Sequence, residues 1–215
     1  IAKISGHIEN SSAFNGIITA TVRDSKQLIV GRMNDPIETP TAFSFSDRPK
    51  TLYSGSNKVV NGKFQLSFAV PLDINYTDGT GLVNLYAVSD DDQQLANGSN
   101  DRFTIGGSDK ISNDSIGPSI YCYLNSPSFV NGGEVNSTPY FVAQINDANG
   151  INASGNGIGH NLQLIVDGDM SKTYVLNGNF AYDSGSYTSG MTNYNLPELT
   201  PGPHKLTFKA WDILN

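Results

Sequence analysis

The stretch INASGNGIGHNLQLIVDGD, residues 151–169, contains the two patterns that decide the fold. Its second half alternates apolar and polar residues, so that Leu162, Leu164 and Val166 share one face of an extended chain. This period of two predicts a β-strand. Its first half, three alternate glycines before His160, is the kind of segment that either cradles a phosphate or forms a turn.

The glycines of this segment, Gly155, Gly157 and Gly159, lack the G-x-G-x-x-G spacing of a dinucleotide-binding loop. A phosphate cradle also needs the amides of a helix N-terminus, whereas a strand pattern follows here. Because glycine tolerates positive φ, we interpret the segment as an irregular turn that leads into the strand.

The same alternation recurs along the whole chain and no long helical stripe interrupts it, which predicts an all-β protein. Turn signals separate the segments, at Asn-Gly 61–62, 97–98, 131–132, 149–150 and 177–178, Asp-Gly 78–79 and 167–168, and Pro-Gly 201–202. The predicted strands cover residues 3–9, 16–24, 42–45, 51–54, 63–70, 81–89, 119–124, 138–145, 160–167, 172–176, 191–196 and 204–212.

This strand density predicts two tandem immunoglobulin-like β-sandwich domains, residues 1–108 and 109–215. The most polar stretch between strands, residues 106–118, is the predicted linker. Because contacts between domains are usually modest and polar, we expect a hinge there unless a large apolar interface forms.

Composition limits the classes of partner. The net charge is −7, with 10 Lys+Arg against 12 Asp+Glu up to residue 110 and 3 against 8 after it. Neither half offers the basic face that nucleic acid or anionic lipid requires. No apolar run is long enough to insert in a membrane. The single cysteine forms no internal disulfide, which suits a bacterial cell-surface protein, and we expect the chain to be a piece of a longer one.

The nucleophiles and bases of the sequence are isolated. Cys122 lies in SIYCYLN, where we expect it to face the core with a raised thiol pKa. His160 has no matched nucleophile, and a dyad with Cys122 is the one pairing that the sequence leaves open. His7 and His204 lie beside strand positions, and these residues form no zinc motif. We therefore predict no catalytic residue, metal ligand or cofactor-binding residue.

Clustered acidic loops are the sites that calcium would suit best. They comprise Asp90, Asp91 and Asp92 and the loops around Asp147, Asp167 and Asp169. None follows the EF-hand spacing, so solvated hairpin turns are the preferred interpretation. A glycan could instead stack on exposed tyrosines, of which Tyr182, Tyr187 and Tyr194 are the first candidates.

A resemblance adds to this interpretation. The second half contains Gly117-Pro118, F-x-x-G-G at 129–133, D-x-x-G-I-N at 147–152, I-G-H at 158–160, V-L-N at 175–177, and G-x-H-x-L through A-W-D ending at Asp212. The first half contains Ile4-Ser-Gly6, Phe14-Asn-Gly16, LYSGSNKVVNGKFQLSF, and VPLDINYTDGTG with D-I-N-Y at 73–76. In order and spacing the chain closely resembles the C-terminal β-region of the PorU family, gingipain-like (peptidase C25) cysteine peptidases of Bacteroidota.

The resemblance implies that the parent is a sortase of type IX secretion. It would remove C-terminal sorting domains from secreted cargo and pass the cargo, through an acyl-enzyme, to a lipopolysaccharide-type acceptor on the outer membrane. The family's catalytic Cys and His lie in a caspase-like domain upstream, so no catalytic residue carries over to Cys122 or His160.

Three roles are then open. The chain could brace the peptidase domain and dock on outer-membrane shuttle or attachment proteins and cargo, at the cell surface of a Gram-negative bacterium. It could be a carbohydrate-binding or adhesive module of similar sequence. A free-standing thiol enzyme, inactivated by Cys122→Ala, is the third.

Overall fold

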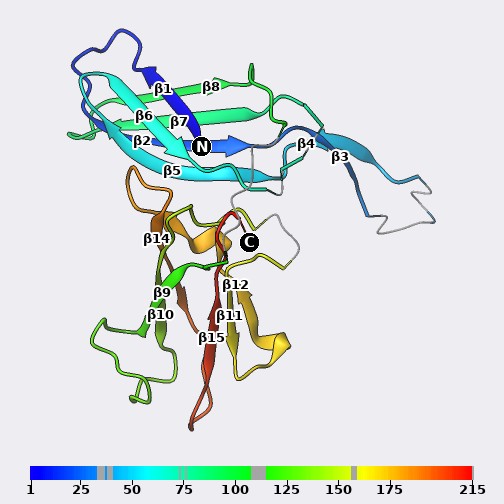
Figure 1. Cartoon of the computed structure of the whole chain (residues 1–215), viewed down its shortest axis with the longest axis vertical. Coiled ribbons are helices and arrows are strands. Elements are labelled where there is room, and N and C mark those ends of the chain that lie inside the picture. Colours follow the sequence, from blue (N-terminus) through cyan, green and yellow to red (C-terminus); the bar gives the residue numbers. More distant parts are fainter. Residues whose placement is uncertain are drawn as a thin grey trace.

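The computed structural model describes residues 1–32, 37, 41–72, 74–75, 77–107, 115–155 and 159–214. In these ranges the chain consists of β-strands, turns and two single-turn 3-10 helices, η1 (Met170–Lys172) and η2 (Asn177–Asn179). Within them no helix has the length and apolarity of a membrane span. The all-β prediction is therefore confirmed, and Figure 1 shows the strands gathered in two bodies with an arm at one side.

The N-terminal body is built on a four-stranded antiparallel sheet in the order β5-β2-β7-β8. Its strands are β2 (Gly16–Arg23), β5 (Thr51–Val59), β7 (Leu82–Ser89) and β8 (Leu95–Asn100). A second antiparallel pair, β1 (Ala2–His7) with β6 (Lys63–Phe68), covers the sheet. Alternate residues of β2 and β6 are buried, so the period of two seen in the sequence fills one core, with Ile18, Val22, Leu66 and Phe68 among its members.

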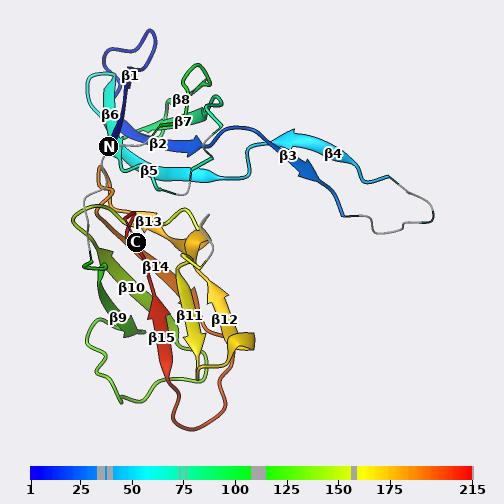
Figure 2. The ribbon, with the colours of Figure 1, turned by 45° about the vertical axis from the view of Figure 1, so that its right-hand side comes forward.

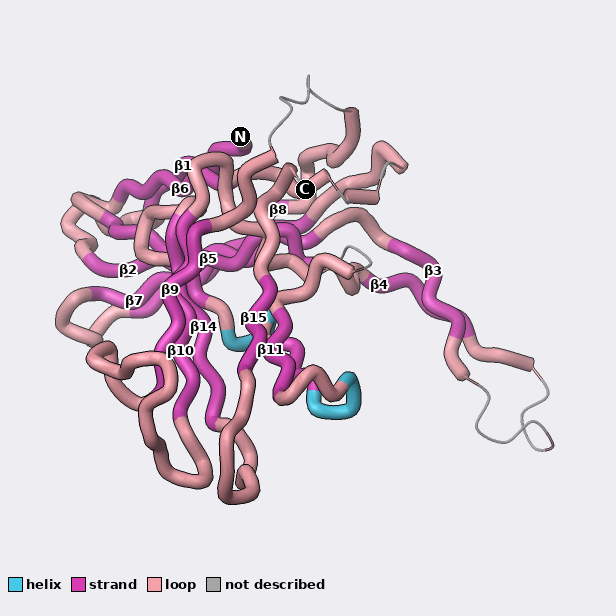
Figure 3. The backbone as a smooth tube through the Cα atoms, turned by 60° about the horizontal axis from the view of Figure 1, so that its bottom comes forward, coloured by secondary structure: helices cyan, strands magenta, loops and turns pink. Residues whose placement is uncertain are grey.

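The arm is a two-stranded antiparallel hairpin that leaves the end of the β2–β5 ladder. Its strands are β3 (Gln27–Val30) and β4 (Ser44–Asp47). Figure 1, Figure 2 and Figure 3 show it projecting well away from both bodies, and no described segment lies over either of its faces.

The C-terminal body is a sandwich of two sheets. One has the order β13-β14-β10-β9, with β9 (Ser119–Leu124), β10 (Tyr140–Asn146), β13 (Ala181–Tyr182) and β14 (Ser189–Asn195). The other has the order β12-β11-β15, with β11 (Gln163–Val166), β12 (Thr173–Val175) and β15 (Leu206–Lys209). Figure 2 shows the two sheets one behind the other. Ala143, Ile145, Leu162, Leu164 and Val166 are fully buried between them.

The two bodies are in contact at one end of the C-terminal sandwich. The rings of Tyr53 and Tyr182 lie 5.3 Å apart across this junction, and Gly185 N donates to Ser56 O over 2.7 Å. Gly150, at φ +120°, brings its backbone close to the side chains of Tyr187 and Ala69, where any larger residue would collide. The junction is thus partly apolar, although the predicted linker and domain boundary fall largely on residues 108–114, outside the described residues.

Turn chemistry was predicted well at most positions. Asn61-Gly62 and Asp167-Gly168 have positive φ at both residues, as a type I′ hairpin turn requires. The prediction at Asn97-Gly98 was wrong, because β8 continues through this pair in register with β7. Strand β8 is an almost wholly exposed edge strand, so its polar sequence carries no core signal. The immunoglobulin-like assignment of both bodies stays a prediction.

Replacement of Tyr182 by Phe should lower the free energy of unfolding by about 0.5–1.5 kcal/mol. The Tyr182 hydroxyl donates to Ile151 O over 2.6 Å, and Ala153 N donates to the same carbonyl over 3.1 Å, so the variant removes one of two donors to a buried residue. Urea unfolding measures the loss. Tyr187→Phe is the matched control, since its ring lies at the same junction; an equal loss in both variants would contradict the assigned role of the hydrogen bond.

Candidate functional site

The arm exposes apolar side chains that nothing in the described chain covers. Leu28 is 69% exposed, Val30 60% and Phe43 74%, and the Phe43 ring stacks on Phe45 with centroids 5.9 Å apart. Gly31 N donates to Phe43 O over 2.8 Å, which extends the hairpin ladder by one step. An isolated two-stranded hairpin is marginally stable in water. The shape of the arm therefore depends on its root, the place where its two strands join the N-terminal body. The arm presents a surface suited to another protein.

A buried polar network holds the root of the arm. Arg48, only 6% exposed, donates through Nη1 to the carbonyls of Asp24, over 3.0 Å, and of Thr80. Its second guanidinium nitrogen donates to Thr80 Oγ1 over 3.3 Å. The planar guanidinium thus ties the start of the arm to the loop before β7.

The Asp24 carboxylate completes this root from the opposite side. Its two oxygens accept from Ser25 N and Asn75 N, each over 2.6 Å. Ser25 Oγ in turn lies 3.0 Å from Thr77 Oγ1 and accepts from Asn75 Nδ2 over 3.0 Å. Asp24 and Ser25 are essentially unexposed, and a buried carboxylate is stable only when donors surround it in this way. The arm is thereby joined to a preorganised turn.

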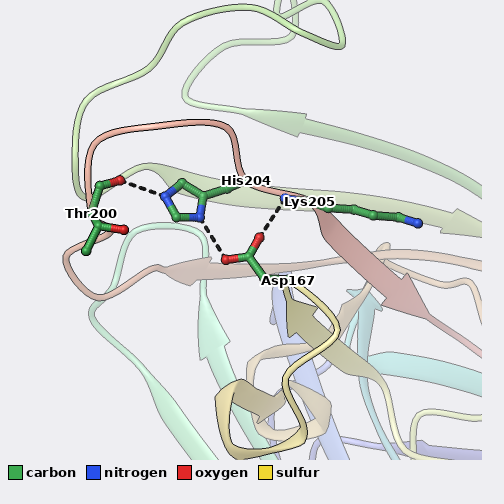
Figure 4. A network of polar contacts seen from close by, with 4 residues as sticks. All are labelled: Asp167, Thr200, His204 and Lys205. Carbon is green, nitrogen blue, oxygen red and sulfur yellow. Dashed lines mark hydrogen bonds and ion pairs between the residues drawn. The ribbon is translucent and has the colours of Figure 1, made fainter.

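A second polar cluster lies at the far end of the C-terminal body, where the β14–β15 loop meets the turn after β11 (Figure 4). His204 Nδ1 lies 2.8 Å from Asp167 Oδ2, and its Nε2 lies 2.7 Å from Thr200 O. The other Asp167 oxygen accepts from Lys205 N over 2.8 Å. The Thr200 carbonyl and then Asp167 raise the pKa of His204, while the bonds from Lys205 and His204 lower the pKa of Asp167.

This cluster resembles half of a catalytic triad but cannot act as one. A carbonyl oxygen only accepts, so Nε2 must carry a proton to bond with Thr200, and Nδ1 donates to the carboxylate. The arrangement favours the doubly protonated imidazolium. A general base needs a free ring nitrogen aimed at a nucleophile, and here both nitrogens are engaged. The cluster instead links the β14–β15 loop to the turn after β11, and we call it the loop clasp.

The structure separates Cys122 from the histidines. Cys122 lies on edge strand β9 and is exposed, so its predicted place in the core was wrong. The other half of that prediction is confirmed, since partial burial against β10 raises the pKa of the thiol to about 11. The His160 ring instead lies 4.8 Å from Trp211. Within the described residues no hydrogen bond joins Cys122 to a histidine, including His7 on β1.

The glycine segment before His160 is a turn in the part that is described. Gly155 and Gly159 have φ of +63° and +85°, which confirms the need for glycine there, and strand β11 follows. Gly157 lies outside the described residues.

Of the acidic residues nominated for calcium, Asp91, Asp147, Asp167 and Asp169 accept hydrogen bonds in turns. Asp91 Oδ1 accepts from Ser89 Oγ and Gln93 N, which lowers the pKa of Asp91. Asp147 accepts from the amides of residues 149 and 150, and Asp169 caps η1 through Ser171 N. In the described ranges no three His, Cys, Asp or Glu side chains gather as a metal site would require.

The tyrosines nominated for glycan stacking do not form one platform. Tyr182 and Tyr187 pack at the junction against the N-terminal core, and burial, then the nearby Tyr53, raises the pKa of Tyr182. Tyr194 stacks on Tyr174, with centroids 4.8 Å apart, on the C-terminal core. All three side chains are at least partly buried in protein contacts.

A cleft of about 860 Å³ also lies at the junction of the bodies. Its described lining is mainly apolar, and Tyr187 supplies the one titratable side chain in that part of it. Such a lining can accept an apolar group. The arm with its buried root is therefore the strongest candidate for function, and sequence analysis had predicted only its second strand.

Arg48→Ala should destabilise the N-terminal body by about 1.5–3 kcal/mol, because it strips a charged donor from the carbonyl of the buried Asp24 and from that of Thr80. Urea unfolding is the measurement. Arg102→Ala, at an exposed position, should change stability by less than about 0.5 kcal/mol. Similar small effects from both variants would show that the root network does not hold the arm.

The pKa of His204 should lie above 6.5 and fall in Asp167→Asn, as an NMR titration of the imidazole protons would measure. The raised pKa of His204 gives stability that is complete below 6.5 and lost as pH rises through the folded value. The lowered pKa of Asp167 gives stability present above 3.8 and lost as pH falls through its folded value. An unchanged His204 titration in Asp167→Asn would mean that the clasp does not form in solution.

Comparison with known proteins agrees with the all-β architecture described above. No protein-family model and no curated protein matches the chain. Among solved structures, the chain is similar to part of PorU from Porphyromonas gingivalis, described as dimeric and latent, with 32% identity and a TM-score of 0.54. The similarity covers 99% of this chain and 20% of the PorU chain, so this chain spans about a fifth of that protein. Over almost its whole length, the chain resembles a β-region of PorU.

Proposed function

We propose that this chain is the non-catalytic C-terminal β-region of a PorU-like, gingipain-like cysteine peptidase that acts as a sortase of type IX secretion. Its role is to brace the peptidase domain and to supply a docking surface. Similarity over 99% of the chain at 32% identity supports the relationship. The chemistry of the parent then belongs to a caspase-like Cys/His domain upstream.

The observation that carries the docking role is the arm. Leu28 and Val30 are exposed on one face of the projecting hairpin and Phe43 on the other, so both faces of the arm carry apolar side chains. Exposed apolar residues that gather on one projecting element in this way point to an interaction site. Aromatic side chains that enter a partner's pocket commonly dominate the energy of an interface. The buried root of Arg48 and Asp24 fixes the direction of the arm, which lowers the entropy cost of docking.

The partners follow from the parent's activity. A sortase that removes C-terminal sorting domains and transfers cargo to the cell surface must hold its cargo, and it must meet outer-membrane shuttle or attachment proteins. We place the chain on the extracellular side of the outer membrane of a Gram-negative bacterium. The solved PorU is described as dimeric, so a second copy of the parent is the first partner to test.

Leu28→Ser combined with Phe43→Ser, in the full-length parent, should abolish docking while the fold persists. Both side chains are exposed, so thermal stability should change little. Loss of one anchoring aromatic costs about 2 kcal/mol at an interface, or roughly 30-fold in affinity. Removal of the cargo sorting domain in cells and the molar mass by light scattering are the two measurements.

The matched control is Val60→Ser combined with Val175→Ser, which removes two comparably exposed side chains away from the arm. It should leave both measurements unchanged. If the arm variant also leaves cargo processing and molar mass unchanged, the docking role is wrong. If deletion of residues 1–215 leaves processing intact, the scaffold role is wrong as well.

A further inference from the structure

The C-terminal sandwich is open along one side, and both of its sheets show it. In the sheet that ends at β9, the core-facing residues of β10 are buried, with Ile145 0% exposed. Its cross-strand partner on β9, Ile120, is 37% exposed, and Cys122, opposite the buried Ala143, is exposed too. Cross-strand partners share a face, so apolar side chains of β9 point toward a core that does not cover them.

The second sheet shows the same loss of burial at the same side. Leu164 and Val166 on β11 are 0% exposed, whereas their partners on β15, Phe208 and Leu206, are only partly buried. Figure 2 shows β15 and β9 at the same edge of the sandwich, one in each layer. The two half-covered strips therefore lie at the same side of the sandwich, where the edge strand of each sheet is left partly uncovered.

The backbone of β15 is also prepared for that strand. Asp167 N donates to Lys205 O over 2.7 Å, and hydrogen-bonded pairs alternate along an antiparallel ladder. The backbone groups of Thr207 and Lys209 therefore point to β11, and those of Leu206 and Phe208 point outward. No described residue pairs with this outer edge, since β15 is the last strand of its sheet. An apolar edge of this kind is normally covered.

The strand order identifies the missing position. In a seven-stranded immunoglobulin sandwich, strands A, B, E and D form one sheet and C, F and G the other. Here β9-β10-β14-β13 has the order A-B-E-D, and β11 and β15 occupy the places of C and F. Nothing in the described chain occupies G, the strand that lies antiparallel to F on its outer edge.

We propose that the polypeptide following residue 215 in the longer parent supplies this strand, antiparallel to β15. It would be at least as long as β15, four residues, with alternate apolar side chains covering Ile120, Cys122 and Phe208. Strands consecutive in sequence are neighbours in space roughly two times in three, which favours the same chain as the source. The matched region makes up 20% of the PorU chain, so a parent of that kind contains polypeptide outside the region seen here.

Residue-resolved hydrogen exchange on the intact, monomeric parent tests the proposal without altering it. The amides of Thr207 and Lys209 bond to β11 and serve as the internal reference. With the strand in place, the amides of Leu206 and Phe208 should be protected to within roughly tenfold of that reference. Exchange of Leu206 and Phe208 at the rate of an open edge would overturn the proposal.

Truncation of the parent directly after residue 215 gives the second part of the test. Leu206 and Phe208 should then exchange roughly tenfold faster or more, and iodoacetamide should modify Cys122 faster. The amides of β8, an open edge of the other body, should stay as they were. Protection that disappears when an oligomeric parent is diluted to monomer would place the strand in another chain and overturn the proposal, as would a native chain that stops at residue 215.

Discussion

The arm exists because the charges of Arg48 and Asp24 are solvated by protein. Arg48 is 6% exposed and Asp24 0%, so each must find its hydrogen bonds within the protein. The carbonyls of Asp24 and Thr80 satisfy the guanidinium, and the amides of Ser25 and Asn75 satisfy the carboxylate. Two segments far apart in sequence meet in one rigid turn, and the strands of the arm leave from it in a defined direction.

A second constraint couples the arm to the C-terminal body. The ladder of β2 and β5 that leads to the arm also carries Tyr53, whose ring packs on Phe68 in its own core and on Tyr182 across the junction. The hydrogen bond from Gly185 N to Ser56 O adds a directional link on the same strand. A hinge is the expectation unless a large apolar interface forms, and the described junction combines aromatic rings with a backbone hydrogen bond on β5.

From the sequence, the strands and turns could be predicted wherever the alternation of apolar residues and the type of turn residue encode them. Alternation located strands such as β6 and β11, and Asn61-Gly62 marked a hairpin turn, because burial on one face imposes these patterns. It failed at Cys122, since alternation shows which face a residue shares but cannot show whether another layer covers that face. It also missed β3 and the Arg48 root. A hairpin exposed on both faces has no core to impose a pattern, and a buried charge satisfied by distant carbonyls leaves no local signal.

The polar residues that looked most like chemistry share one use, which is to hold turns and loops. Asp91, Asp147 and Asp169 each accept from nearby backbone amides, and His204 bonds through both ring nitrogens between Asp167 and Thr200. The features that the described chain leaves uncovered are apolar: the two faces of the arm and the open side of β9 and β15. Both are strand surfaces, which take protein as a partner more readily than a small molecule because a neighbouring backbone can complete their ladders.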